Sequence, residues 1–153
     1  MKIAGLMLFI TDVHSLGLKL TQGINLTEAW YWDSDDKTRQ WAARFFEKMK
    51  KMPTSMQAAS YSAALQYLKA VQATGTDSAD PVMAQLRKQK IDDMYTANGH
   101  IREDGRMVHD LQLMEVKSPA ESKRPWDYYK PIQRIPAEQA FASKAESRCK
   151  LWN

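Results

Sequence analysis

The segment between Gly23 and Leu68 constrains the fold most, because its hydrophobic pattern changes from that of a strand to that of helices. Residues 24–32 form a short apolar run, rich in β-branched and aromatic side chains without a helical period, which is typical of a strand. A helix is predicted after the Ser/Asp cluster at 33–36, since hydrophobic residues recur at i, i+4 and i+8, namely Trp41, Phe45 and Met49. Pro53 then ends this helix, because the residue before a proline avoids the α conformation.

A second helix is predicted to begin near Gln57 and to end at Gly75, a residue suited to a left-handed C-cap. Its buried face is expected to consist of apolar residues at helical spacing: Tyr61, Ala64, Leu65, Leu68 and Val71. A strand followed by a helix, a loop and another helix is the element order of an α/β protein. The sequence therefore predicts the α/β fold class.

The composition is that of a globular chain rather than a disordered or membrane-spanning one. Hydrophobic residues make up 44% and charged residues 26% of the 153 residues, which suffices for one domain of ordinary size. No apolar run reaches the roughly 18 residues needed to span a bilayer. The net charge is +4, and its densest cluster, Lys48, Lys50 and Lys51, falls at a predicted helix end, where cations complement the macrodipole. We therefore expect no nucleic-acid partner.

The first residues of the chain predict a strand with polar side chains directly after it. Residues 2–11 are nearly all apolar, which is typical of a central strand of a parallel sheet covered on both faces. Asp12, His14 and Ser15 follow at the point where open α/β sheets bind their ligands. The apolar run is too short for a signal peptide, because Asp12 and His14 interrupt it at once.

The residue types that carry chemistry form no pattern of an enzyme or a metal site. His14, His100 and His109 lack the spacing of metal ligands, and Cys149 is the single cysteine. The sequence also contains no phosphate-binding, dinucleotide-binding, nucleophile-elbow or redox motif. Asp12 and His14 share a face if the segment is extended, but no nucleophile accompanies this acid–base pair. We expect neither enzymatic activity nor a cofactor.

The second half of the chain alternates turn signals with strand signals. Asp80-Pro81 is expected to start a further helix. Asn98-Gly99 and Asp104-Gly105 predict the turns of a hairpin, and residues 107–116 are the clearest later strand. From residue 118 onward, prolines interrupt aromatic residues, which predicts an extended segment that wraps over the core.

Several runs of the sequence match one known family in order. They are GLMLFITDVHSLGL, QGINLTEAWYWD, DDKTRQWAARFFEK, PTSMQAASYSAALQYLKAV, NGHIREDGRMVHDLQLMEVK, PWDYYK and ESRCKLW. Together they cover nearly the whole chain, which resembles the C-terminal half of a type I periplasmic solute-binding protein of the branched-chain amino-acid (leucine/isoleucine/valine) ABC-transporter family. The resemblance implies an α/β fold with parts of two lobes, parallel sheets flanked by helices, and an interlobe ligand cleft that closes like a hinge.

The resemblance also implies how the chain is divided between the lobes. Residues 1–27 would end lobe two, residues 28–33 would form a crossover strand, and residues 34–104 would be the C-terminal part of lobe one. Residues 105–153 would contain the return to lobe two and the proline- and aromatic-rich C-terminal segment. Cys149 would find any disulfide partner in the other half of such a protein. The family implies a periplasmic location, whereas the lack of a signal peptide in the sequence leaves a cytoplasmic one open.

Seven residues are expected from the resemblance to contact the ligand: Asp12, His14, Ser15, Tyr31, Gln57, Ala58 and Tyr61. Asp12 stands where the family places an acidic residue, which would pair with a ligand ammonium group. His14 and Ser15 share its loop, and Gln57, Ala58 and Tyr61 would lie at the lobe-one helix start that faces the cleft. Tyr31 would serve either the hinge or the cleft, and helix packing explains Tyr61 equally well.

The resemblance thus implies that the chain is a fragment of the substrate-binding component of an ABC importer. Such a component captures a branched-chain or related amino acid, or a small organic acid, and passes it to a permease. One alternative is a truncated remnant that forms a homodimer and binds no ligand, because a sheet without its first strands exposes edges and apolar surface. Another alternative is an enzyme that uses Asp12 and His14, for which the sequence offers no further residue.

Overall fold

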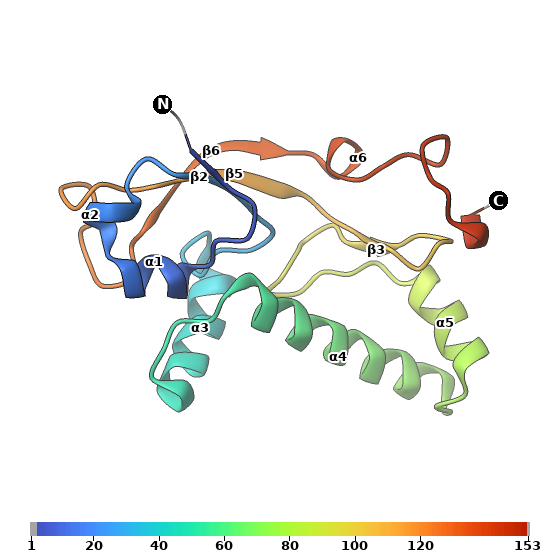
Figure 1. Ribbon diagram of the computed structural model, residues 1–153. Helices are drawn as coiled ribbons and strands as arrows, with labels where there is room; N and C mark the ends of the chain where they lie inside the picture. Colours follow the sequence, from blue (N-terminus) through green and yellow to red (C-terminus); the bar gives the residue numbers. More distant parts are fainter. Residues whose placement is uncertain (1–2, 153) are drawn as a thin grey trace.

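The computed structural model describes residues 3–152, which form a four-stranded sheet and a layer of helices (Figure 1). The strands lie side by side in the order β1 (Ala4–Gly5), β2 (Asn25–Glu28), β5 (Leu111–Val116) and β6 (Tyr129–Ile135). β1 runs parallel to β2, whereas β2, β5 and β6 pair antiparallel. The predicted α/β class is confirmed, with a sheet of mixed strand direction.

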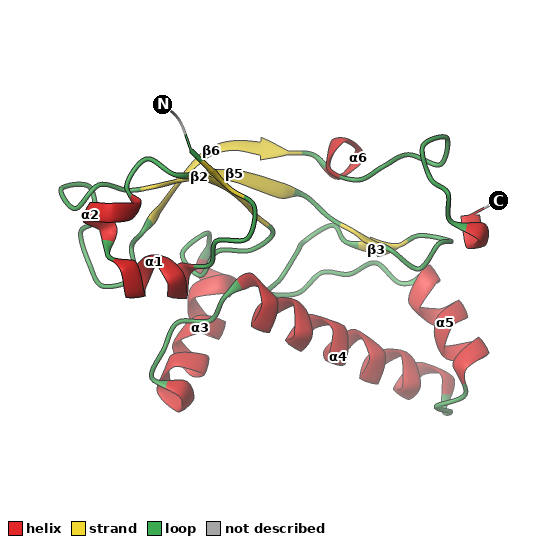
Figure 2. Cartoon of the chain, in the orientation of Figure 1, coloured by secondary structure: helices red, strands yellow, loops and turns green. Residues whose placement is uncertain are grey.

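The helices fall into two groups, drawn in red in Figure 2. α1 (Ile10–Leu16) and α2 (Leu18–Thr21) lie next to the sheet, whereas α3 (Asp36–Met49), α4 (Ser55–Thr74) and α5 (Ala79–Lys88) form a separate helical part. The chain leaves the sheet after β2 to enter α3, and it comes back to the sheet at β5. Within residues 3–152, no helix combines the length and the apolar character that crossing a membrane requires.

The remaining elements are short: β3 (His100–Ile101), β4 (Met107–Val108), α6 (Ala137–Ala140) and the 3-10 helix η1 (Lys150–Trp152). β3 and β4 pair antiparallel and form the predicted hairpin. The strand predicted over residues 107–116 is divided between β4 and β5, because its first part pairs with β3 and its second part with β2 and β6.

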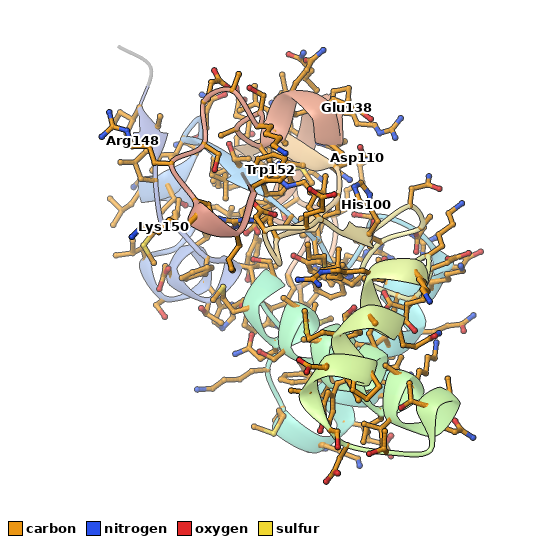
Figure 3. All side chains as sticks on the ribbon, turned by 90° about the vertical axis from the view of Figure 1, so that its right-hand side faces the viewer. His100, Asp110, Glu138, Arg148, Lys150 and Trp152 are labelled. Atoms are coloured by element: carbon orange, nitrogen blue, oxygen red, sulfur yellow. The ribbon has the colours of Figure 1, made fainter. Side chains whose placement is uncertain are left out.

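The C-terminal residues are held on the β3–β4 hairpin by an arginine. The guanidinium carbon of Arg102 lies 3.7 Å from the centre of the Trp152 ring, and Arg102 also forms an ion pair with Asp104 at 2.6 Å. Figure 3 shows Trp152 in the same part of the molecule as Asp110 and His100, above the green helices. The end of the described chain therefore packs on the sheet side of the molecule.

The ends of α3 and α4 are set by local sequence signals. The carboxylate of Asp35 caps α3 by accepting the backbone N–H of Thr38 at 2.8 Å. The hydroxyl of Thr54 caps α4 by accepting the N–H of Met56 at 3.2 Å. Gly75 ends α4 in the left-handed conformation with φ of 67°, as the sequence predicts. Short-range chemistry therefore fixes where both helices begin and end.

The prediction of a central strand over residues 2–11 was wrong. Only β1 pairs with the sheet, where it lies at one edge, and residue 2 is outside the described part of the chain. The end of the run opens α1 instead, because the Asp12 carboxylate accepts the backbone N–H of Phe9 at 2.8 Å. Leu6 and Met7 are 97% and 80% exposed, so the run is not covered on both faces.

The prediction of an apolar buried face on α4 was also wrong. Tyr61 and Leu68 of that face are 42% and 61% exposed, whereas the helix buries small or polar residues: Ser55, Ala58, Ser62, Gln66 and Ala70. The Asp93 carboxylate explains this orientation, because it accepts hydrogen bonds from the Ser62 hydroxyl at 2.6 Å and the Gln66 amide at 2.8 Å. The loop after α5 that contains Asp93 thus determines that the polar face of α4 is the buried one.

The hydrophobic core joins the sheet to α1, α3 and α4. Its buried members are Ile10, Val13, Leu26, Trp30, Tyr31, Trp32, Trp41, Ala42, Ala58, Met114, Val116, Trp126 and Tyr129. The backbone carbonyl of Trp126 accepts hydrogen bonds from the Trp32 indole at 2.9 Å and the Tyr31 hydroxyl at 3.2 Å. The proline- and aromatic-rich segment therefore does pack over the core, and it is anchored to the residues that follow β2.

Candidate functional site

A buried carboxyl group lies where the sheet meets the start of α4. Glu28, the last residue of β2, is 5% exposed. Burial raises the pKa of Glu28 from 4.5 to about 7, and a hydrogen bond with the Ser55 side chain partly offsets that rise. Ser55 is the first residue of α4, so the carboxyl group bridges the sheet and the helical part of the molecule.

A buried hydroxyl group without a hydrogen-bond partner lies on the same side of the sheet. Tyr129 opens β6 and is 2% exposed, and its hydroxyl has no partner within the described chain. Burial raises the pKa of Tyr129, and the negative charges of Glu28 and, more weakly, Asp12 raise it further. Native proteins pair nearly all buried polar groups, so a hydroxyl of this kind calls for a functional explanation.

The strand register places Glu28 and Tyr129 on one face of the sheet. Glu28 pairs with Gln112 of β5, and Tyr129 pairs with Val116 of the same strand. Because Gln112 and Val116 are four residues apart, their side chains point to the same face, and their cross-strand partners do too. We call Glu28, Ser55 and Tyr129 the buried polar cluster.

Three of the residues predicted from the sequence lie around the buried polar cluster. The charge of Asp12 acts on the Tyr129 hydroxyl, although the Asp12 carboxylate also caps α1. The Tyr31 ring lies 5.2 Å from the Tyr129 ring, measured between centroids. Ala58 is fully buried, one turn after Ser55 along α4. The structure thus brings residues from four separate elements to one region.

His14 and Ser15 instead contact groups of their own surroundings. The His14 ring stacks on Trp126 with 3.9 Å between centroids, and its Nδ1 lies 2.7 Å from the Tyr128 hydroxyl. The Ser15 hydroxyl donates to the backbone carbonyl of Thr11 at 2.9 Å. Both side chains are exposed, and neither lines the two cavities described below.

Gln57 and Tyr61 lie on the outer side of α4. The Gln57 side-chain oxygen accepts the backbone N–H of Thr54 at 2.8 Å, which makes it part of the helix cap. An open cavity of about 370 Å³ lies between α3 and α4, and it is lined by Trp41, Phe45, Met56, Gln57, Ser60 and Tyr61. This mostly apolar surface is separate from the buried polar cluster, with which it shares no residue.

A cavity of about 580 Å³ is lined by residues of the two segments that join the sheet to the helical part, within 29–38 and 93–97, and by Asp110, Gln112 and Arg134. Its acidic side chains already have partners. Asp35 caps α3, Asp93 accepts from Ser62 and Gln66, and Asp110 pairs with Arg134. The cavity therefore offers fewer free polar groups than its size suggests, and we place more weight on the buried polar cluster.

Neither metal ligands nor the members of the buried polar cluster emerged from the sequence. Across residues 3–152, His, Cys, Asp and Glu side chains form no group of three that could hold a metal ion. Glu28 carries a usable signal, because in a strand it shares its face with Leu26 and Trp30, where a charged residue is unusual. Tyr129 carries none, since it is one aromatic residue among several in a proline-rich segment.

The fold is that of part of a periplasmic binding protein. The sequence model of the family described as "Periplasmic binding protein" matches residues 1–123, and the chain therefore belongs to this family. Among curated proteins, none matches the chain.

Solved structures extend the similarity over the whole chain. A periplasmic binding protein from Burkholderia mallei is 61% identical over 100% of this chain and 40% of its own, with a TM-score of 0.97. A branched-chain amino acid ABC transporter periplasmic ligand-binding protein from Burkholderia xenovorans is 46% identical over 99% of this chain and 41% of its own, with a TM-score of 0.94. The chain thus spans about two-fifths of the length of these relatives.

More distant structures share the fold alone. A leucine-binding protein from Thermotoga maritima is 16% identical over 84% of this chain and 35% of its own, with a TM-score of 0.65. The Burkholderia xenovorans protein is named as a ligand-binding protein of an ABC transporter, and the Thermotoga maritima protein as a leucine-binding protein. The predicted similarity to the branched-chain amino-acid type of periplasmic binding protein is confirmed.

Proposed function

We propose that the chain acts in the substrate-binding component of a periplasmic ABC importer, which captures a branched-chain or related amino acid, or a small organic acid, between two lobes. The observation that carries the proposal is the 46% identity, over 99% of this chain, to a protein named as a branched-chain amino acid ABC transporter ligand-binding protein. A membrane permease is the partner that such a component requires, and no cofactor takes part.

The arrangement of the chain supports a lobe-like division. The main sheet lies within residues 1–27 and 105–153, apart from the last residue of β2. The helices α3, α4 and α5 lie within residues 34–104. Residues 28–33 connect the two parts, as a crossover would (Figure 1). We propose that the first two ranges belong to lobe two and the third to lobe one.

The proposed cleft lies between the start of α1 and the start of α4. The ring of Tyr31 lies 5.2 Å from that of Tyr129, the charge of Asp12 acts on the Tyr129 hydroxyl, and Ala58 belongs to the same buried core. His14, Ser15, Gln57 and Tyr61 lie further out, and we propose them as contacts made when the lobes close. An acidic side chain suits an ammonium group, and such a charge-assisted hydrogen bond contributes about 1.5–3 kcal/mol away from water.

Calorimetric titration of the chain with leucine, isoleucine and valine, and with 3,4-dihydroxybenzoate as a small organic acid, tests the proposal. We expect saturable binding of at least one of them, weakened about tenfold or more in Asp12→Asn for an amino acid. The asparagine still caps α1, so this variant keeps its fold. Asp36→Asn is the matched control, because Asp36 is exposed and pairs with Arg39. Equal affinity of wild type and Asp12→Asn would remove Asp12 from the site.

A second function, a dimerising module without a ligand, is favoured by one observation. The outer surface of α4 exposes large hydrophobic side chains, namely Met56, Tyr61, Tyr67 and Leu68. Such a surface on a soluble chain marks a contact with another polypeptide. Light scattering after size exclusion distinguishes the two functions: a dimer that binds none of the four compounds supports the module, and a ligand-binding monomer contradicts it.

A further inference from the structure

The segment that connects the sheet to the helical part carries a carboxylate that both parts share. Asp33 lies between β2 and α3, and its side chain is 14% exposed. One carboxylate oxygen pairs with Arg39 of α3 at 3.2 Å, and the other pairs with Arg124 of the loop between β5 and β6. A single side chain therefore joins the helical part to the sheet at the point where the chain crosses between them.

Further contacts tie the loop between β5 and β6 to the connecting segment. The guanidinium carbon of Arg124 lies 5.2 Å from the centre of the Trp32 ring, within the range of a cation–π contact. The Trp126 carbonyl accepts hydrogen bonds from the Trp32 indole and the Tyr31 hydroxyl. Three consecutive residues of the connection, Tyr31 to Asp33, thus contact this loop.

The backbone of the loop is held in a conformation that its sequence disfavours. Trp126 has a φ of 67°, in the left-handed region that bulky residues rarely adopt. The two hydrogen bonds to its carbonyl hold it there, together with the stacking of its ring on His14 at 3.9 Å between centroids. Strained residues persist only where their surroundings hold them, and they cluster at sites of function. The loop therefore keeps its place on the connection against a local backbone preference.

We propose that Asp33 is a positioning residue that sets the angle between the sheet and the helical part of the molecule. Asp33, Arg39 and Arg124 together are called the crossover clamp. The clamp stands on contacts within the chain, whereas its consequence for ligand capture rests on the proposed function, in which the lobes move about this connection.

Distances between the two parts, measured by double electron–electron resonance on the ligand-free chain, test the clamp. Spin labels are attached to Gln72→Cys on α4 and Gln133→Cys on β6, both exposed, in a Cys149→Ser background. We expect one main distance when the clamp is intact. Asp33→Asn should raise the fraction of molecules outside this distance about fivefold, because two partly exposed ion pairs are lost. An unchanged distribution in Asp33→Asn overturns the inference.

Two further variants and a control separate positioning from a general loss of structure. Arg39→Gln and Arg124→Gln each break one of the two pairs, from opposite sides, and each should raise the same fraction less than Asp33→Asn does. Asp36→Asn is the matched control, because it removes a pair with Arg39 at 2.7 Å that lies within α3. It should leave the distribution unchanged, and an effect as large as that of Asp33→Asn overturns the inference.

The distance measurement needs no ligand, so its outcome is independent of the proposed function. An effect of Asp33→Asn on the distances, in a chain that binds none of the compounds tested by calorimetry, supports the clamp and contradicts the proposed function. A chain that binds leucine and shows the same distances with and without the Asp33 carboxylate contradicts the clamp alone.

Discussion

Glu28 shows how burial changes the chemistry of one residue. Its neighbours on the same face of the structure, Leu26 and Trp30, are core residues, and the sheet carries the carboxyl group into their environment. Burial favours the neutral form, so the pKa of Glu28 rises to about 7. The residue is therefore near its protonation midpoint at neutral pH, where proximity to a cation would favour ionisation.

The raised pKa of Glu28 makes the stability of the chain depend on pH. Because the folded pKa of about 7 exceeds the unfolded value of 4.5, the folded state holds the proton more tightly between these values. The contribution of Glu28 to the free energy of unfolding is fully present below about pH 4.5, and it is lost as the pH rises through 7. At 1.36 kcal/mol per pKa unit, the loss is about 3 kcal/mol.

The variant Glu28→Gln tests this linkage, because the amide keeps the shape and cannot ionise. We expect urea unfolding to show little difference from wild type at pH 4.5, and a variant more stable by about 2–3 kcal/mol at pH 8. Wild type and variant have the same other titrating groups, so their difference isolates Glu28. A difference that stays constant over this pH range would contradict the assignment.

At the scale of elements, a single loop decides how α4 is oriented. Asp93 follows α5 and accepts hydrogen bonds from the side chains of Ser62 and Gln66, two consecutive inward positions of α4. Its second oxygen accepts the backbone N–H of Tyr95 at 2.8 Å, which fixes the loop itself. The polar face of α4 is buried for this reason, and the apolar face points outward.

Replacing Asp93 should therefore cost more than replacing its neighbour. Asp93→Ala leaves Ser62 and Gln66 without their buried acceptor, and we expect a loss of about 3 kcal/mol in the free energy of unfolding. Asp92→Ala removes only an exposed pair with Lys37 and should change the free energy of unfolding much less. Chemical denaturation of both variants measures the difference, and equal losses would contradict the role of Asp93.

At the scale of the whole molecule, the chain exposes apolar surface that a self-contained domain rarely shows. Leu6, Met7 and Leu20 near the sheet are 97%, 80% and 75% exposed, and the outer side of α4 adds further large side chains. The chain also spans only about two-fifths of the length of its solved relatives. Exposed apolar surface of this extent is typical of a contact with another polypeptide.

A charge on this surface should change association without changing the fold. Leu68 is 61% exposed, so Leu68→Glu is expected to alter the free energy of unfolding by no more than about 0.5 kcal/mol. Sedimentation velocity at rising concentration should show less self-association than in wild type. Ala73→Glu places the same charge at another exposed position of α4 and should leave association unchanged. Equal association of all three chains would show that the α4 surface is not involved.

Some features of this protein follow from its sequence because their causes are local. Thr54 and Gly75 fix the ends of α4 through their own backbone and side-chain preferences, and the ordered runs of sequence identify the family. Asp12, Tyr31 and Ala58 were predicted from that resemblance, and all three lie around the buried polar cluster. Whether they bind a ligand stays a prediction.

Other features depend on contacts between distant residues, and only the tertiary structure decides them. The apolar run at residues 2–11 satisfies a strand or a helix equally well, and the single parallel pairing of β1 with β2 decides how much of it is strand. The buried face of α4 depends on Asp93, a residue outside the helix. Glu28 and Tyr129 are about one hundred residues apart, and only the register of β5 with both neighbours brings them to one face of the sheet.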